Sequence, residues 1–122
     1  MLYIAIALIV ATGIAHSYLG ERYLLIRLFR RDNLPKILGS AAFTIGTLRF
    51  VWHLLTVTWF GFAYLLFVAL HAPVSTGDVL RTFGVVSLIS AAFPLFFTRG
   101  KHLSWIVFFT IGVLLLFAAA GH

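Results

Sequence analysis

Three long apolar runs without Asp, Glu, Lys or Arg constrain this chain more than any other feature. They extend from Leu2 to Leu19, from Val51 to Leu70 and from Leu103 to Ala120. A helix rises about 1.5 Å per residue and the hydrocarbon core of a bilayer is about 30 Å thick, so about 20 apolar residues are enough to cross it. We therefore expect each run to form a transmembrane helix.

A fourth apolar run, from Val79 to Phe97, contains Arg81 near its start, and Ser75, Thr76 or Asp78 is suited to cap it. The sequence thus predicts an all-α polytopic membrane protein. Its four transmembrane helices, at about residues 2–19, 50–70, 79–97 and 103–120, are expected to form one bundle in a single domain, residues 1–122.

Composition supports a membrane protein and removes several kinds of chemistry. Hydrophobic residues make up 62% of the chain and charged residues 10%, whereas soluble domains average about 45–50% and about 25%. The chain has no cysteine, which excludes disulfides, thiolate metal ligands and a cysteine nucleophile. A soluble globular fold and an intrinsically disordered chain are both incompatible with this composition.

Basic residues are concentrated at one end of the predicted helices. Because such residues collect in cytoplasmic loops, we expect both termini on the periplasmic side of a bacterial inner membrane. This asymmetry accounts for the net charge of +6, so no nucleic-acid partner is expected. The residues in the two predicted cytoplasmic loops are Arg22, Arg27, Arg30, Arg31, Lys36, Arg49, Arg99 and Lys101, and only Arg81 lies on the other side.

The segment from Glu21 to Arg31 is amphipathic. At about 100° per residue, Arg27, Arg30 and Arg31 fall on one face and the leucines on the other. We expect an interfacial helix on the cytoplasmic leaflet, with these three arginines in contact with lipid headgroups. The alternative is a continuation of the first helix into the cytoplasm. Pro35 ends the segment in either case.

Four polar residues are predicted to lie near one level of the membrane. Counted along the predicted helices, Glu21 and Arg49 reach the inner boundary, and His16 and His53 lie about 6–7 Å deeper. Arg49 and His53 are four residues apart and share a helix face. Ionisable groups at such depth are costly and usually face the protein interior, so we expect His16, Glu21, Arg49 and His53 to form a pocket that binds a ligand or cofactor.

The residues leave the nature of that pocket open. Two imidazoles, His16 and His53, suit the axial ligation of haem b, and with a carboxylate they suit a divalent metal such as zinc, manganese or iron. Arg49 and the histidines also suit a phosphate, a lipid headgroup or a quinone carbonyl. A purely structural alternative is that the histidines hydrogen-bond to backbone, Glu21 or Arg49 and join the helices.

Other residues point to packing rather than catalysis. Gly84, Ser87 and Ala91 form a stripe of small residues, as do Thr58 and Gly61, and both predict close contact between helices. The only acids are Glu21, Asp32 and Asp78, so no Ser-His-acid set is evident and we expect a non-enzymatic protein.

Two strings resemble small four-helix inner-membrane proteins of bacteria: HSYLGERYLLIRLFRR, from His16 to Arg31, and LRFVWHLLTVTWFGFA, from Leu48 to Ala63. The resemblance covers about a quarter of the chain. It implies a bacterial inner membrane and supports His16, Glu21, Arg49 and His53 as one set, but it supplies no activity.

The sequence therefore predicts an integral membrane protein whose Arg/His/Glu pocket binds a ligand, with haem b or a divalent metal as the most specific forms. The alternative is an accessory or assembly subunit of a larger membrane complex, without a cofactor of its own. The lipid bilayer is one expected partner, and a homo-oligomer or a larger complex is the other.

Overall fold

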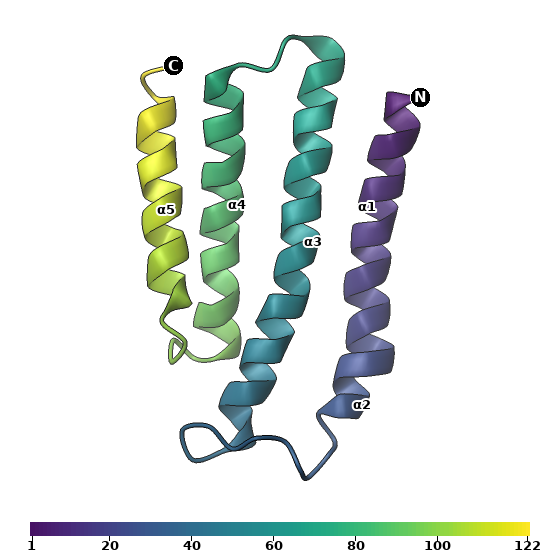
Figure 1. Ribbon diagram of the computed structural model, residues 1–122, viewed down its shortest axis with the longest axis vertical. Coiled ribbons are helices and arrows are strands. Elements are labelled where there is room, and N and C mark those ends of the chain that lie inside the picture. The colour runs from purple at the N-terminus through teal and green to yellow at the C-terminus, as the bar shows by residue number, and fades with distance from the viewer.

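A computed structural model describes all 122 residues and contains helices and turns but no strand. The all-α fold predicted from the sequence is confirmed. The four long helices are α1 (Leu2–Leu19), α3 (Ala41–His71), α4 (Thr76–Phe97) and α5 (Ser104–Ala119) (Figure 1). Two short elements follow α1, namely η1 (Gly20–Leu25), a π-helical turn, and α2 (Ile26–Leu28).

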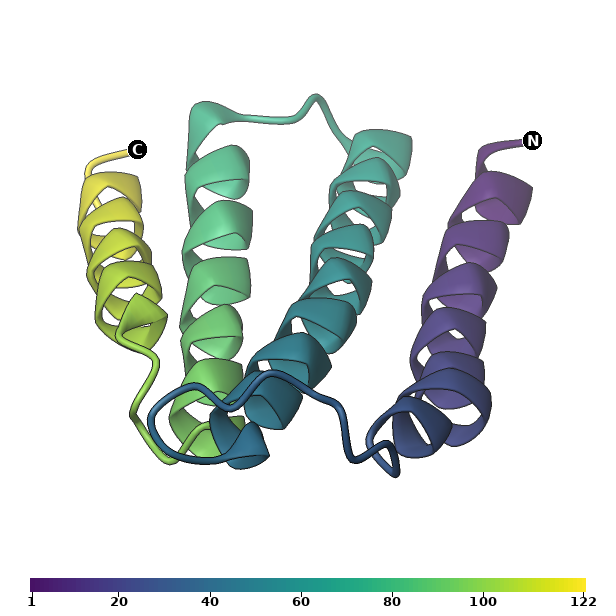
Figure 2. The ribbon, with the colours of Figure 1, turned by 60° about the horizontal axis from the view of Figure 1, so that its bottom comes forward.

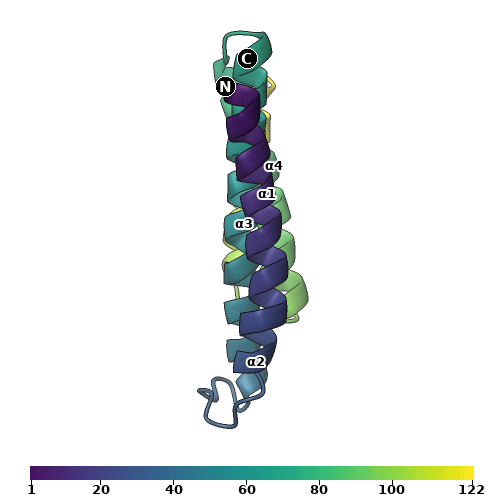
Figure 3. The ribbon, with the colours of Figure 1, turned by 90° about the vertical axis from the view of Figure 1, so that its right-hand side faces the viewer.

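The four long helices stand side by side in one layer. Helix α1 packs on α3, α3 on α4, and α4 on α5, and no other pair of long helices makes close contact. Successive helices run in opposite directions, so both termini lie at the same end (Figure 1). The molecule is narrow when it is seen edge-on (Figure 3). The bundle expected from the sequence is therefore not confirmed, because α1 and α5 lie at opposite edges of an open row.

Glycines allow the neighbouring helices to approach closely. Each of the three helix pairs has two glycines at its contact, and a Cβ atom added at any of them would lie 2.9 Å or less from an atom of the neighbouring helix or of the facing backbone. The close packing expected at Gly61 and Gly84 is confirmed, and the partner helix belongs to the same chain. The six glycines are Gly13 and Gly20 for α1 with α3, Gly46 and Gly61 for α3 with α4, and Gly84 and Gly112 for α4 with α5.

The segment after α1 continues that helix, which is the alternative that the sequence left open, and it does not form a separate interfacial helix. The π-helical turn η1 joins α1 to α2, and one helix extends from Leu2 to Leu28. Leu25, placed on the membrane-facing side by the sequence, is only 2% exposed and lines a groove with residues of α3. The apolar face of the segment is therefore covered in part by α3, because the helix runs on past the end of α1 beside its neighbour.

Helix α3 begins at Ala41, well before the expected start near residue 50. The Ser40 hydroxyl caps it by accepting a hydrogen bond from the Ala42 amide at 3.3 Å. The segment from α2 passes beneath this end of α3 (Figure 2), and Thr44 donates to the Pro35 carbonyl at 2.7 Å. Helix α4 starts at Thr76, a few residues before Val79, and Ser75, one of the three caps expected from the sequence, is confirmed as its cap.

Three helices are long and apolar enough to cross a membrane: Leu2–Leu28, Ala41–His71 and Thr76–Phe97. Helix α5 is apolar as well, but it has 16 residues and falls short of that length. The chain thus has the helices of a membrane protein. With 31 residues, α3 is about 46 Å long at helical rise and exceeds the thickness of a hydrocarbon core.

The contact at Gly20 is the tightest of the six. A Cβ there would lie 2.1 Å from Nε1 of Trp52, so we expect Gly20→Ala to push α1 away from α3 and to lower the free energy of unfolding by about 1–3 kcal/mol. Thermal unfolding in detergent, followed by circular dichroism, measures the loss. Gly121→Ala is the control, because its nearest neighbour lies at 3.7 Å. Equal stability of the two variants would contradict the prediction.

Candidate ligand-binding site

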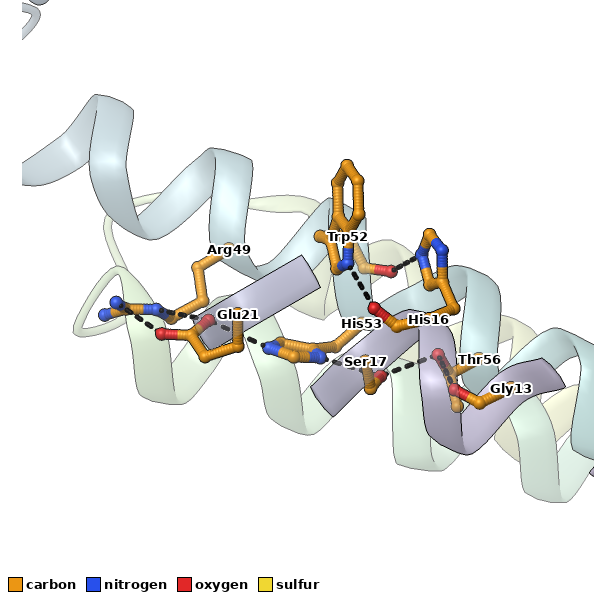
Figure 4. Close-up of polar contacts among 8 residues, drawn as sticks. All are labelled: Gly13, His16, Ser17, Glu21, Arg49, Trp52, His53 and Thr56. Atoms are coloured by element: carbon orange, nitrogen blue, oxygen red, sulfur yellow. Dashed lines mark hydrogen bonds and ion pairs between the residues drawn. The ribbon is translucent and has the colours of Figure 1, made fainter. Parts of the chain in front are cut away.

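The carboxylate of Glu21, in η1, joins two cationic or hydrogen-bonding side chains of α3. Arg49 holds it in a fork, with Nη2 at 2.7 Å from Oε1 and Nε donating to Oε2 at 3.1 Å. His53 Nε2 lies 3.3 Å from the same Oε2 (Figure 4). Such two-point pairing of guanidinium and carboxylate is geometrically specific. Three of the four residues expected to form a pocket are therefore brought together.

The contacts continue from His53 toward the middle of α1. His53 Nδ1 lies 2.9 Å from the Ser17 hydroxyl, which lies 2.7 Å from the Thr56 hydroxyl. Thr56 donates to the carbonyl of Gly13 at 3.2 Å. Figure 4 shows these groups as one connected series between the two helices. The network is defined here as Arg49, Glu21, His53, Ser17 and Thr56.

The network is built around one ion pair, with polar side chains on one side of it. Glu21 Oε2 accepts from Arg49 Nε and also lies against His53 Nε2. The Ser17 hydroxyl lies between His53 Nδ1 and Thr56, and Thr56 donates to the Gly13 carbonyl. Each polar side chain of the network therefore has at least one partner on the other helix.

His16 takes no part in the network. Its ring stacks on Trp52, with centroids 4.5 Å apart and planes at 6°. Its Nε2 lies 3.2 Å from the Trp52 carbonyl, and the Trp52 indole donates to the His16 carbonyl at 3.0 Å. His16 lines a separate groove of about 550 Å³ with leucines of η1 and α2. The structure thus gives His16 and His53 different surroundings.

Aromatic rings of α4 cover the charged end of the network. Phe93 and Phe97 lie beside the His53 imidazole, with ring centroids at 6.4 and 6.1 Å. The Arg49 guanidinium carbon lies 5.0 Å from the centre of the Phe29 ring, a cation–π distance. Glu21 and Arg49 remain 28% exposed and His53 17%, so the network is shielded from one side and open on another.

The open side faces a groove of about 680 Å³ over α3, between α1 and α4. Four residues of the network, Ser17, Glu21, His53 and Thr56, line this groove together with Arg22 and Tyr18. Most of its surface is apolar, and the other lining residues are apolar as well. These apolar residues are Ile14, Ile26, Val57, Phe60 and Phe93.

The other histidines lie apart from the network. His71 Nδ1 contacts the carbonyl of Phe67 in its own helix at 2.8 Å. His102 packs on Phe43 and Phe50 of α3 and contacts the Ser104 hydroxyl at 2.8 Å. No three His, Asp or Glu side chains gather in a group that could hold a metal ion. The three headgroup-contact candidates Arg27, Arg30 and Arg31 are exposed at the end of α2 and in the turn that follows.

Sequence reasoning missed Ser17 as the link between the helices, although a signal was present. At about 100° per residue, Ser17 lies about 40° around α1 from Glu21, whereas His16 lies about 140° away. Ser17 therefore shares a helix face with Glu21, and His16 does not. The sequence analysis used depth in the membrane without rotation about the helix axis, and it therefore grouped His16, not Ser17, with Glu21.

Comparison of the chain with models of protein families, with curated protein sequences and with solved structures yields no match. The chemistry of the site is therefore inferred from its geometry.

The ion pair between Glu21 and Arg49 should contribute measurably to stability. A double-mutant cycle with Glu21→Gln and Arg49→Gln is expected to give a coupling free energy of about 1 kcal/mol, because the pair is forked and partly buried. Thermal or denaturant unfolding in detergent measures it. The Asp78–Arg81 pair is the matched control, since it has one contact at 3.7 Å and Arg81 is 55% exposed. A coupling energy no larger than that of the control would refute the prediction.

Proposed function

We propose that this chain is a multi-pass protein of the bacterial inner membrane in which all four long helices cross the bilayer. The uncharged, apolar α5 and its antiparallel packing on α4 support a fourth crossing. Basic residues gather at the end opposite both termini, and the excess of Lys and Arg in cytoplasmic loops orients that end toward the cytoplasm. The network then lies near the cytoplasmic leaflet.

Its proposed function is non-enzymatic binding of a membrane-soluble ligand through the ligand's polar group. One observation supports this proposal. Residues of the charged network line a groove on the face of the helix layer, and the rest of that groove is apolar. Charges inside a membrane are costly unless they serve an interaction. A ligand that enters from the bilayer would cover the open side of the network.

Among the ligand classes that the sequence left open, the geometry favours a polar headgroup or a quinone carbonyl over haem b or a divalent metal. Haem b ligation would require His16 and His53 to face one common point, yet His16 stacks on Trp52 and His53 is engaged at both nitrogens. A metal would require a third ligand beside Glu21 and His53, and no such group is near. Hydrogen bonding to a polar headgroup requires no such rearrangement.

The test is native mass spectrometry of the protein purified in mild detergent from its membrane. We expect a bound small molecule near one per chain and its loss in His53→Gln, because this change removes the imidazole that lines the groove. His71→Gln is the matched control, since His71 lies outside the groove. Circular dichroism establishes that both variants are folded.

Two results would overturn this proposal. A Soret band or about one metal ion per chain, lost in the His53 variant, would replace it with the cofactor interpretation. Absence of any bound molecule, or equal occupancy in the wild type and in His53→Gln, would show that the network only joins the helices.

A second candidate function, as an accessory subunit of a larger membrane complex, is favoured by the open layer. Helices α3 and α4 each contact only their neighbours, so both faces of the layer are free to meet another protein. This function predicts purification with a membrane partner in fixed ratio, and this ratio should not change in His53→Gln. A chain that stays monomeric in its native membrane, by chemical cross-linking, would exclude it.

A further inference from the structure

The groove beside the network continues along α3 toward the opposite end of the molecule. A second groove of about 500 Å³ lies between α3 and α4, and Val57 and Phe60 line both. Tyr64 and Arg81 line the far part of the second groove, and its other walls are mostly apolar. From His53 to Tyr64 the path covers 11 residues of helix, about 16 Å at helical rise. One continuous surface thus has a charged end and a long apolar course.

Positive charge is in excess at the charged end. The negative charge of Glu21 is balanced by Arg49 within the network, so it leaves none for a further cation. Arg22 lines the same groove and forms no ion pair, its guanidinium lying 5.9 Å from the Tyr23 ring. Neither of the other two acidic side chains pairs with Arg22 in this groove. Asp78 pairs with Arg81, and Asp32 does not line the groove. An anion is therefore the charge that complements this end.

From these two observations we infer that the ligand is a long-chain amphiphile with an anionic headgroup. This inference rests on the proposed function. Arg22 and the His53 end of the network bind the headgroup, and the hydrocarbon chain lies along Val57 and Phe60 toward Tyr64. A carboxylate and a phosphate both meet the charge requirement. The ligand is therefore an anionic group on a hydrocarbon chain, as in a fatty acid or a phospholipid.

The assignment differs from ordinary contact with bilayer lipids in two ways. Bilayer lipids around a helix exchange without regard to a single arginine, whereas this site requires Arg22 at one defined position. Bilayer lipids can also rearrange around an added tryptophan side chain. In contrast, a tryptophan at position 57 would fill the groove where its two parts join. Headgroup and chain can thus be tested separately.

The test is native mass spectrometry of the protein, delipidated in a neutral maltoside detergent and titrated with trace dodecyl phosphate, dodecanoate, dodecanol or inorganic phosphate. We expect the two anionic amphiphiles to bind about tenfold more tightly than dodecanol, because a charge-assisted hydrogen bond is lost in the alcohol. Inorganic phosphate alone should bind more weakly than dodecyl phosphate, because it has no chain. The ratio of dodecyl phosphate to dodecanoate distinguishes the two sources of the anion.

Two matched pairs of variants locate the ligand. Arg22→Gln should weaken dodecyl phosphate binding about tenfold, whereas Arg99→Gln should not, since Arg99 is exposed at the same end of the molecule but does not line the groove. Val57→Trp should weaken dodecyl phosphate and leave inorganic phosphate unchanged. Leu55→Trp is its control, because Leu55 lines the groove on the other side, beside His16.

The outcomes separate this inference from the proposed function. If dodecanol binds as tightly as the anions and Arg22→Gln has no effect, while His53→Gln still removes the native ligand, the inference fails and the proposed function stands. If inorganic phosphate binds as tightly as dodecyl phosphate, the hydrocarbon chain of the ligand does not contribute to binding, and the inference also fails. If no amphiphile binds and His53→Gln changes nothing, both fail.

Discussion

In an apolar surrounding, helices gain no free energy by exchanging lipid for apolar side chains, so shape and hydrogen bonds must hold them together. The rest of this structure depends on that constraint. Six glycines bring neighbouring helices into close contact, two at each of three contacts. Between α1 and α3 the close approach also places Ser17 near His53 and Thr56 near the Gly13 carbonyl. The packing of small residues thus makes the polar network geometrically feasible.

The network has two consequences that follow from the same contacts. It joins α1 to α3 through a forked ion pair and a series of hydrogen bonds, which a low-dielectric surrounding strengthens when every group is satisfied. It also leaves its charged end open to a groove, because the helices form an open layer and nothing in the chain covers that face. Stability and the proposed binding are therefore linked through Glu21 and His53, and a bound anion would stabilise the fold by an amount that grows with the logarithm of its concentration above Kd.

Where the sequence prediction was wrong, the cause was local geometry that depends on a neighbour. The segment after α1 was expected to turn onto the membrane surface, but Gly20 lies against the Trp52 indole, and the helix widens into a π-helical turn and continues beside α3. Helix α3 was expected near residue 50, because membrane thickness was used as its limit. Its start at Ala41 depends instead on the Ser40 cap and the contact between Thr44 and Pro35. The expected bundle is a separate case: it is not confirmed, since only adjacent helices make contact.

The sequence by itself determined the helical class, three of the four predicted membrane-crossing helices, and the end where basic residues gather. It also placed Glu21, Arg49 and His53 near one level, together with His16. These properties depend on position along a helix axis, which follows from counting residues at a constant rise. Only the tertiary structure decided that His16 turns to Trp52, that Ser17 and Thr56 complete the network, and that the helices form an open layer. These depend on the rotation of each helix about its axis and on its choice of neighbour. Both are set by contacts between residues far apart in the chain, such as Ser17 with His53 and Gly84 with Leu116.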